Sequence, residues 1–181
     1  MELNRREERV LGMFFEEPLR KFKFKDIVER AGLHRDNANK WIERLKKENM
    51  ISRVKPKGKF PYYTANYDNV AFRNRKRLYA LSLLYESGLL DALAGLGKAE
   101  AVVIFGSFAR SDWHKNSDID VFVYGSAEGF DRDFFERKLK RKIEIFSYKG
   151  RKALNRINPH LLKNIIRGFY VKGSVPLKEA R

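Results

Sequence analysis

The 181-residue chain contains no cysteine. Disulfide bonds and metal sites built from thiolates, such as structural zinc sites, are therefore excluded. No apolar run reaches the roughly 18 residues that a transmembrane helix needs, and the N-terminal segment MELNRREERV is too charged for a signal peptide. We therefore expect a cytoplasmic protein that has no membrane partner.

Acidic residues are scarce relative to basic ones. The chain has 23 Asp and Glu against 39 Lys and Arg, which gives a formal net charge of +16 and an isoelectric point near 10.0. An excess of this size favours a polyanionic partner, provided that the charge gathers on one face of the protein. The length allows one large or two small hydrophobic cores, and the motifs described next favour two.

The most informative stretch is AVVIFGSFARSDWHKNSDIDVFVYG, which begins at Ala101. Its first five residues are small, β-branched or aromatic and predict a buried strand that ends at Gly106 and Ser107. Glycine and serine can form a tight turn there that opens a helix. Because the first amides of a helix have no partner within the helix, this turn could bind a phosphate group.

Asp118 and Asp120 begin the next predicted strand, over residues 118–124. Residues two apart on a strand share a face, so their carboxylates are expected to lie side by side. Adjacent like charges are unfavourable unless a cation lies between them. Oxygen ligands of this kind suit Mg²⁺ or Mn²⁺, so the pair predicts a metal site.

Gly106-Ser107, ten intervening residues and Asp118-Ile119-Asp120 together resemble the active-site motif of the DNA polymerase beta superfamily of nucleotidyltransferases. The short spacing looks most like the minimal nucleotidyltransferases of bacteria and archaea. The resemblance implies a mixed sheet flanked by helices over residues 98–181. One departure is Ser111, which follows the Ala-Arg pair where many members of the superfamily have glycine.

The resemblance also implies a third carboxylate on a neighbouring strand, because the superfamily usually binds two metal ions with three acidic side chains. Glu144 fits best, because it alternates with Ile143 and Ile145 in a predicted strand, residues 142–148. The competing interpretation is that Glu144 is an ordinary exposed strand residue. The acids Asp131, Asp133 and Glu136 fall in a predicted helix and its approach and fit less well.

By this resemblance the protein transfers a nucleoside monophosphate, expected to be AMP from ATP, to a hydroxyl group of a protein or nucleic acid. The implied catalytic and metal-binding residues are Asp118, Asp120 and Glu144, and the implied phosphate-binding residues are Gly106, Ser107 and Arg110. Two of these have rival explanations, since Ser107 could only cap a helix and Arg110 could be a surface residue. Antitoxins among the minimal nucleotidyltransferases make a partner toxin a credible protein acceptor.

Residues 1–66 predict three helices followed by a hairpin of two strands. The first helix is expected to contain Val10, Leu11, Phe14 and Phe15 at helical spacing and to stop near Pro18. The second is expected from about Phe24 to Ala31, and the third from His34 or Arg35 to about Glu48. The strands are expected over residues 50–54 and 62–65, joined by a basic turn. This order resembles a winged helix-turn-helix domain.

In that family the third helix enters the DNA major groove and the hairpin tip contacts phosphates. The resemblance therefore implies a DNA-binding set, which consists of Arg35, Asn37, Asn39 and Lys40 on the helix and Lys57 and Lys59 on the hairpin. Small trihelical domains also bind RNA or proteins, and a lysine-rich helix face can be only a solvated surface.

Residues 67–97 predict a helical connector with an apolar stripe that includes Leu78, Leu81, Leu84 and Tyr85. The stripe fits either a homodimer seam or packing against the chain's own domains. The expected fold class is therefore α+β with two domains, residues 1–66 and 98–181. An alternative function is a transcription regulator whose nucleotidyltransferase-like domain only senses a nucleotide, and an adaptor protein is a third, less favoured possibility.

Overall fold

The computed structural model describes residues 5–176, with side chains from Glu7 onward. The backbone divides into two compact units, Met1–Tyr79 and Ala80–Arg181, and the division falls inside the helix α4 (Val70–Glu86). Each unit is described below by itself. Across residues 5–176, every helix is too short or too polar to cross a membrane.

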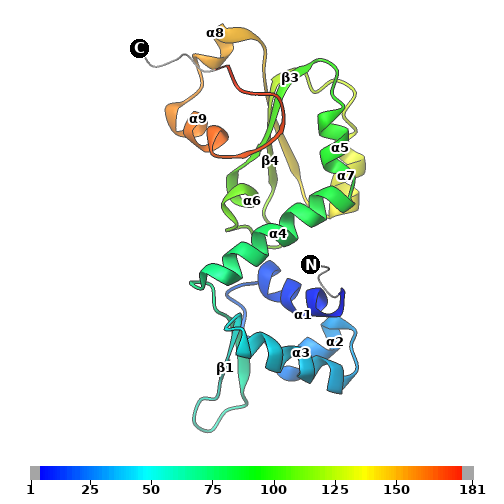
Figure 1. Ribbon diagram of the computed structural model, residues 1–181, viewed down its shortest axis with the longest axis vertical. Coiled ribbons are helices and arrows are strands. Elements are labelled where there is room, and N and C mark those ends of the chain that lie inside the picture. Colours follow the sequence, from blue (N-terminus) through cyan, green and yellow to red (C-terminus); the bar gives the residue numbers. More distant parts are fainter. Residues whose placement is uncertain (1–4, 177–181) are drawn as a thin grey trace. The chain divides into compact units, whose positions relative to one another are not determined.

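The N-terminal unit is formed by helices α1 (Arg5–Glu16), α2 (Phe24–Ala31) and α3 (Arg35–Lys47), the strands β1 (Ile51–Val54) and β2 (Tyr62–Ala65), and the first part of α4 (Figure 1). The two strands form an antiparallel hairpin. The predicted bounds of α2 and β2 are confirmed. The predicted N-terminal helices and small hairpin are thus present in the predicted order.

The sequence pattern of α3 explains why this segment folds as a helix with one buried face. The side chains of Ala38, Trp41, Ile42 and Leu45 recur at helical spacing and all are buried, as the sequence predicts. The turn before the helix begins at Gly32, which closes α2 in the left-handed conformation that glycine adopts without strain. Phe22 extends the hairpin, because it exchanges backbone hydrogen bonds of 2.9 and 2.7 Å with Tyr63.

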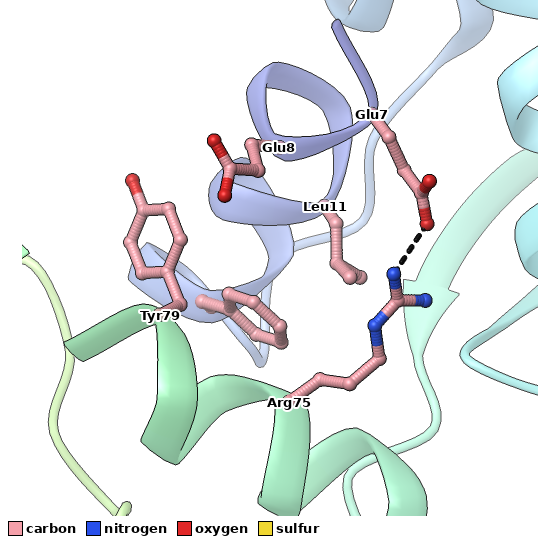
Figure 2. A pocket seen from close by; sticks show the side chains of 6 residues that line it. Glu7, Glu8, Leu11, Arg75 and Tyr79 are labelled. Carbon is pink, nitrogen blue, oxygen red and sulfur yellow. Dashed lines mark hydrogen bonds and ion pairs between the residues drawn. The ribbon is translucent and has the colours of Figure 1, made fainter. Parts of the chain in front are cut away.

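A buried ionic cluster joins α1 to α4 within this unit. The Glu7 side chain is only 4% exposed, and its Oε1 accepts a hydrogen bond of 2.6 Å from Arg75 (Figure 2). Arg75 also donates to Glu48 at 2.8 Å. Because a buried charge is unfavourable without a partner, each member of the cluster depends on the others. The cavity beside it, lined partly by Leu11 and Tyr79, has a volume of about 10 Å³ and has room for roughly one water molecule.

The C-terminal unit is a four-stranded sheet with helices on both sides. Its elements in chain order are the end of α4, α5 (Leu89–Ala94), β3 (Ala99–Phe105), α6 (Gly106–Arg110), β4 (Ile119–Gly125), α7 (Arg132–Leu139), β5 (Ile143–Tyr148), α8 (Gly150–Leu154), α9 (Pro159–Ile166) and β6 (Phe169–Lys172). The strand order is β5-β4-β3-β6. Strand β3 is antiparallel to β4 and β6, whereas β4 and β5 are parallel. The predicted α+β class and mixed sheet are confirmed.

One face of this sheet is covered by α8 and α9. Phe105 of β3 and Phe122 of β4 point to this face and share a buried core with Leu154 of α8 and Ile165 of α9. Helices α5 and α7 lie on the opposite side of the sheet (Figure 1). The sequence analysis did not predict α8. It also placed the start of β4 at Asp118, whereas the strand begins one residue later, at Ile119.

Candidate active site

The bend between β3 and α6 lies directly against the carboxyl group of Asp120. Gly106 has a φ of +70°, which side chains other than hydrogen rarely permit. A Cβ atom built on Gly106 would lie 1.9 Å from Asp120 Oδ2. The register explains this approach, because Phe105, the residue before the bend, pairs with Asp120 across the sheet. Glycine is therefore required here both by the backbone conformation and by the neighbouring carboxylate.

Glu144 is the direct neighbour of Asp120 on the adjacent parallel strand, since the two residues pair in the β4–β5 register. Paired residues share a face of the sheet, so the two side chains project on the same side. This is the face that carries Phe122 and the covering helices α8 and α9. Asp118 precedes β4 by one residue and is partly buried.

The pKa of the Asp120 carboxyl group reflects its burial and these neighbouring charges. Burial raises the pKa of its carboxyl group, the charges of Glu144 and Asp118 raise it further, and the pKa reaches about 6 although Arg110 acts to lower it. Like charges oppose ionisation of a neighbouring acid, whereas a positive charge favours it. Glu144, Asp118 and Arg110 therefore lie close enough to Asp120 to influence its carboxyl group.

The phosphate-binding candidates lie on α6. The residue that caps α6 is Phe105 and no side chain caps the helix, so the alternative that Ser107 serves as the cap is wrong. Ser107 is partly exposed. Arg110 is exposed, and its Nε donates a hydrogen bond of 2.9 Å to Asp112. Its side chain is thus held at the end of the helix that begins at the bend.

The chemistry of the three carboxylates fits a hard divalent cation, because all the ligand atoms would be oxygen. Within residues 5–176, however, no group of three or more His, Cys, Asp or Glu side chains is gathered tightly enough to hold a metal ion. The three acids therefore stay a predicted ligand set.

Arg141 is a structural contributor that the sequence analysis missed. Its Nη1 donates to the carbonyl oxygens of His114 at 2.7 Å, Lys115 at 2.9 Å and Ser117 at 3.2 Å. Its guanidinium also lies 5.3 Å from the ring centres of Phe108 and Trp113. Arg141 thereby ties the loop that ends at Asp118 to α6 and to the start of β5. In the sequence it is one cation in the basic run KLKRK, and nothing there distinguishes it.

The predicted DNA-binding residues all lie in the N-terminal unit, whereas the three acids belong to the C-terminal unit. On α3, Arg35, Asn39 and Lys40 are exposed and Asn37 is partly buried, and in the hairpin turn Lys57 and Lys59 are exposed. The guanidinium of Arg35 lies 5.3 Å from the ring centre of Phe24. A shallow hollow on the turn is lined by residues 55–60.

Residues 87–166 match the model of the nucleotidyltransferase domain family. This part of the chain is a nucleotidyltransferase domain. The match includes the Gly106 bend, Asp118, Asp120 and Glu144. It confirms the predicted enzyme class, which is nucleotidyltransferase. The N-terminal unit lies outside the matched residues, and no curated protein matches the chain.

Several solved structures are similar to part of the chain. Two are crystal structures of a toxin-antitoxin, one of them a mutant of the pair MntA-HpeT and the other with AMP-PNP, at 17% and 19% identity. Each match covers 54% of this chain and 73% of the other, with a TM-score of 0.31. A candidate nucleotidyltransferase from Sulfolobus solfataricus is 20% identical over 58% of this chain and 94% of its own, also at a TM-score of 0.31. Similarity at this level does not indicate an activity or a partner.

Replacing Gly106 by alanine tests the contact between the bend and Asp120. We expect Gly106→Ala to lower nucleotidyl transfer by at least about 100-fold, because the methyl group must displace the Asp120 carboxyl or open the bend. Gly129→Ala is the matched control, since Gly129 also has a positive φ but has no atom within 4 Å of an added Cβ. Both variants should lose about 1–2 kcal/mol of stability from the left-handed backbone, measured by urea unfolding. Equal activities of the two variants would contradict the role of this contact.

Proposed function

We propose that the protein transfers a nucleoside monophosphate, AMP from ATP, to a hydroxyl group of a protein or nucleic acid. The observation that carries the proposal is the seat of the Asp120 carboxyl between the Gly106 bend and Glu144. In this reaction the acceptor oxygen bonds to the α-phosphorus, the bond between the α-phosphorus and its bridging oxygen breaks, and pyrophosphate leaves while the hydroxyl proton is released.

In the proposed site each residue has a distinct task. The amides of the bend and the hydroxyl of Ser107 donate hydrogen bonds to the triphosphate, and Arg110 offsets part of its negative charge. Asp118, Asp120 and Glu144 would hold Mg²⁺ or Mn²⁺ through carboxylate oxygens. The bound ion would supply charge stabilisation for the phosphates and lower the pKa of the attacking hydroxyl. Arg141 fixes the loop before Asp118 and so orients the first of the acids.

The acceptor in the proposal includes a partner toxin, because the Gly-Ser and Asp-x-Asp motif resembles that of antitoxins among the minimal nucleotidyltransferases. An active enzyme fits the residues better than a nucleotide sensor does. A sensor needs a phosphate-binding bend but gains nothing from three coupled carboxylates, whose mutual repulsion is unfavourable.

A labelling experiment tests the activity. The protein is incubated with α-phosphate-labelled ATP, Mg²⁺ or Mn²⁺ and cell extract, and transfer to discrete protein or RNA species is measured. Asp120→Asn should reduce transfer by at least about 100-fold, because a neutral amide lacks the negative charge with which a carboxylate binds a divalent cation. Asp118→Asn and Glu144→Gln should behave similarly.

The matched control for these variants is Asp133→Asn, which removes one carboxylate from the exposed surface of α7 in the same domain. Its transfer rate should stay within about twofold of the unchanged protein. The assignment of the acids fails if Asp120→Asn labels the same species at the same rate as this control.

For the N-terminal unit we propose DNA binding through α3 and the hairpin turn. The support is the order of helices and hairpin, together with the exposure of Asn39 and Lys40 on α3 and of Lys57 and Lys59 in the turn. Asparagine can pair with adenine, and lysines at the turn can contact phosphates. A DNA-binding unit would let the protein act on its own promoter, as a self-regulating toxin-antitoxin pair requires.

Binding to genomic DNA fragments at rising salt concentration tests this proposal. Asn39→Ala and Lys40→Ala should remove the preference for a particular site, whereas Lys57→Ala should weaken binding to all fragments about equally. Lys25→Ala, which removes an exposed cation from α2, is the control and should keep the preference. If site preference survives in Asn39→Ala and Lys40→Ala, these residues do not read the bases.

A further inference from the structure

The C-terminal unit has an unbalanced basic surface on one side of its sheet. From Ile145 to the last described residue the sequence contains no aspartate or glutamate. Six exposed cations lie on α8, on α9 and in the segments beside them, and we call them the α8–α9 basic face: Lys149, Arg151, Lys152, Arg156, Lys163 and Arg167. Among the described residues none of the six forms an ion pair, whereas cations elsewhere in the unit do, as in the pairs Lys98–Glu128 and Arg110–Asp112.

The α8–α9 basic face lies on the same side of the sheet as the predicted catalytic acids. The helices α8 and α9 pack on Phe122 of β4. Residues two apart on a strand share a face, so Asp120 projects to the side that these helices cover. The same holds for Glu144, which pairs with Asp120. An anion that is attracted to the basic helices is therefore also on the side of the carboxylates.

Arg167 marks the end of the basic face nearest to the bend. Strand β6 runs antiparallel to β3, and its first residue, Phe169, pairs with Ile104. Gly168 packs so closely on β3 that an added Cβ would lie 2.6 Å from the Ile104 carbonyl oxygen. Arg167 caps α9 and is joined to β6 by Gly168, so it lies next to the end of β3 that leads into the bend. The basic face thus extends from α8 to the end of the sheet where the bend lies.

An exposed aromatic side chain accompanies the cations at this end. Tyr170 on the edge strand β6 is 39% exposed, and it pairs with Val103, whose side chain belongs to the core under α8 and α9. Aromatic and arginine side chains stack on bases that are not paired, and a groove of positive charge follows the phosphates of a single strand. A double helix would offer no unstacked base to this ring. An acidic protein would match the charge but leave the exposed ring unexplained.

We infer that the α8–α9 basic face binds single-stranded RNA and delivers its terminal hydroxyl to the nucleotidyltransferase site. This inference rests on the proposed function and narrows its acceptor to RNA. The RNA hydroxyl oxygen forms a bond to the α-phosphorus of the nucleoside triphosphate, the α–β phosphoanhydride bond breaks, and pyrophosphate and a proton are released. The RNA leaves one nucleotide longer.

Binding of a short fluorescent single-stranded RNA to the full chain tests the surface without any need for catalysis. Anisotropy is measured between about 50 and 200 mM KCl for the unchanged protein and for Arg156→Gln/Arg167→Gln. Losing two phosphate contacts should weaken binding at least about tenfold and should make the slope of log affinity against log salt shallower by about 1.4. The control Arg137→Gln/Lys138→Gln removes two exposed cations from α7, on the other side of the sheet, and should bind RNA nearly as tightly as the unchanged protein.

Equal weakening by the two variants would overturn the inference, because binding would then follow net charge alone. Tighter binding of a double-stranded DNA of the same sequence, lost in Arg156→Gln/Arg167→Gln, would also overturn it. Thermal unfolding shows whether both variants remain folded, and Arg156→Lys/Arg167→Lys should restore most of the binding. Transfer from labelled ATP to the same RNA is measured in parallel, so that a protein that binds RNA but labels no acceptor contradicts the proposed function and leaves the surface standing.

Discussion

The close approach between the backbone of Gly106 and the carboxyl group of Asp120 is the constraint on which the site depends. It requires a residue without a side chain at the end of β3 and an antiparallel β4 in one particular register. Since a one-residue slip would turn Asp120 to the other face, the buried residues that fix the register also fix the site. Val103 and Phe122, paired and fully buried, are two of these. The hydrophobic core thus determines where the bend meets the acid.

The same constraint gathers negative charge, and the surrounding structure holds it there. Glu144 is carried to Asp120 by a parallel strand, and the loop before Asp118 is fastened by Arg141. Burial raises the pKa of the Asp120 carboxyl group, and the charges of Glu144 and Asp118 raise it further, so the charged form of Asp120 is disfavoured in this arrangement. Carboxylates held close together at one end of a sheet indicate a functional site. The chemistry of these acids favours binding of a cation.

Sequence reasoning succeeded where local pattern decides the structure. The buried stripe of α3 follows from helical spacing, and the strand of Glu144 follows from alternation. It was less successful where contacts between distant residues decide. The start of β4 at Ile119 depends on pairing with β3, and the role of Arg141 depends on carbonyl groups 24 to 27 positions away. The five-residue helix α8 is too short to show a period.

The most direct test of this account is the titration of the Asp120 carboxyl group, followed by carbon NMR with and without Mg²⁺. In the absence of the metal the group should titrate with a pKa of about 6, because burial, Glu144 and Asp118 all disfavour its charged form. Saturating Mg²⁺ should lower this pKa by more than about one unit, because the cation favours the carboxylate. A pKa near the ordinary value of about 4 that does not change when Mg²⁺ is added would contradict the account.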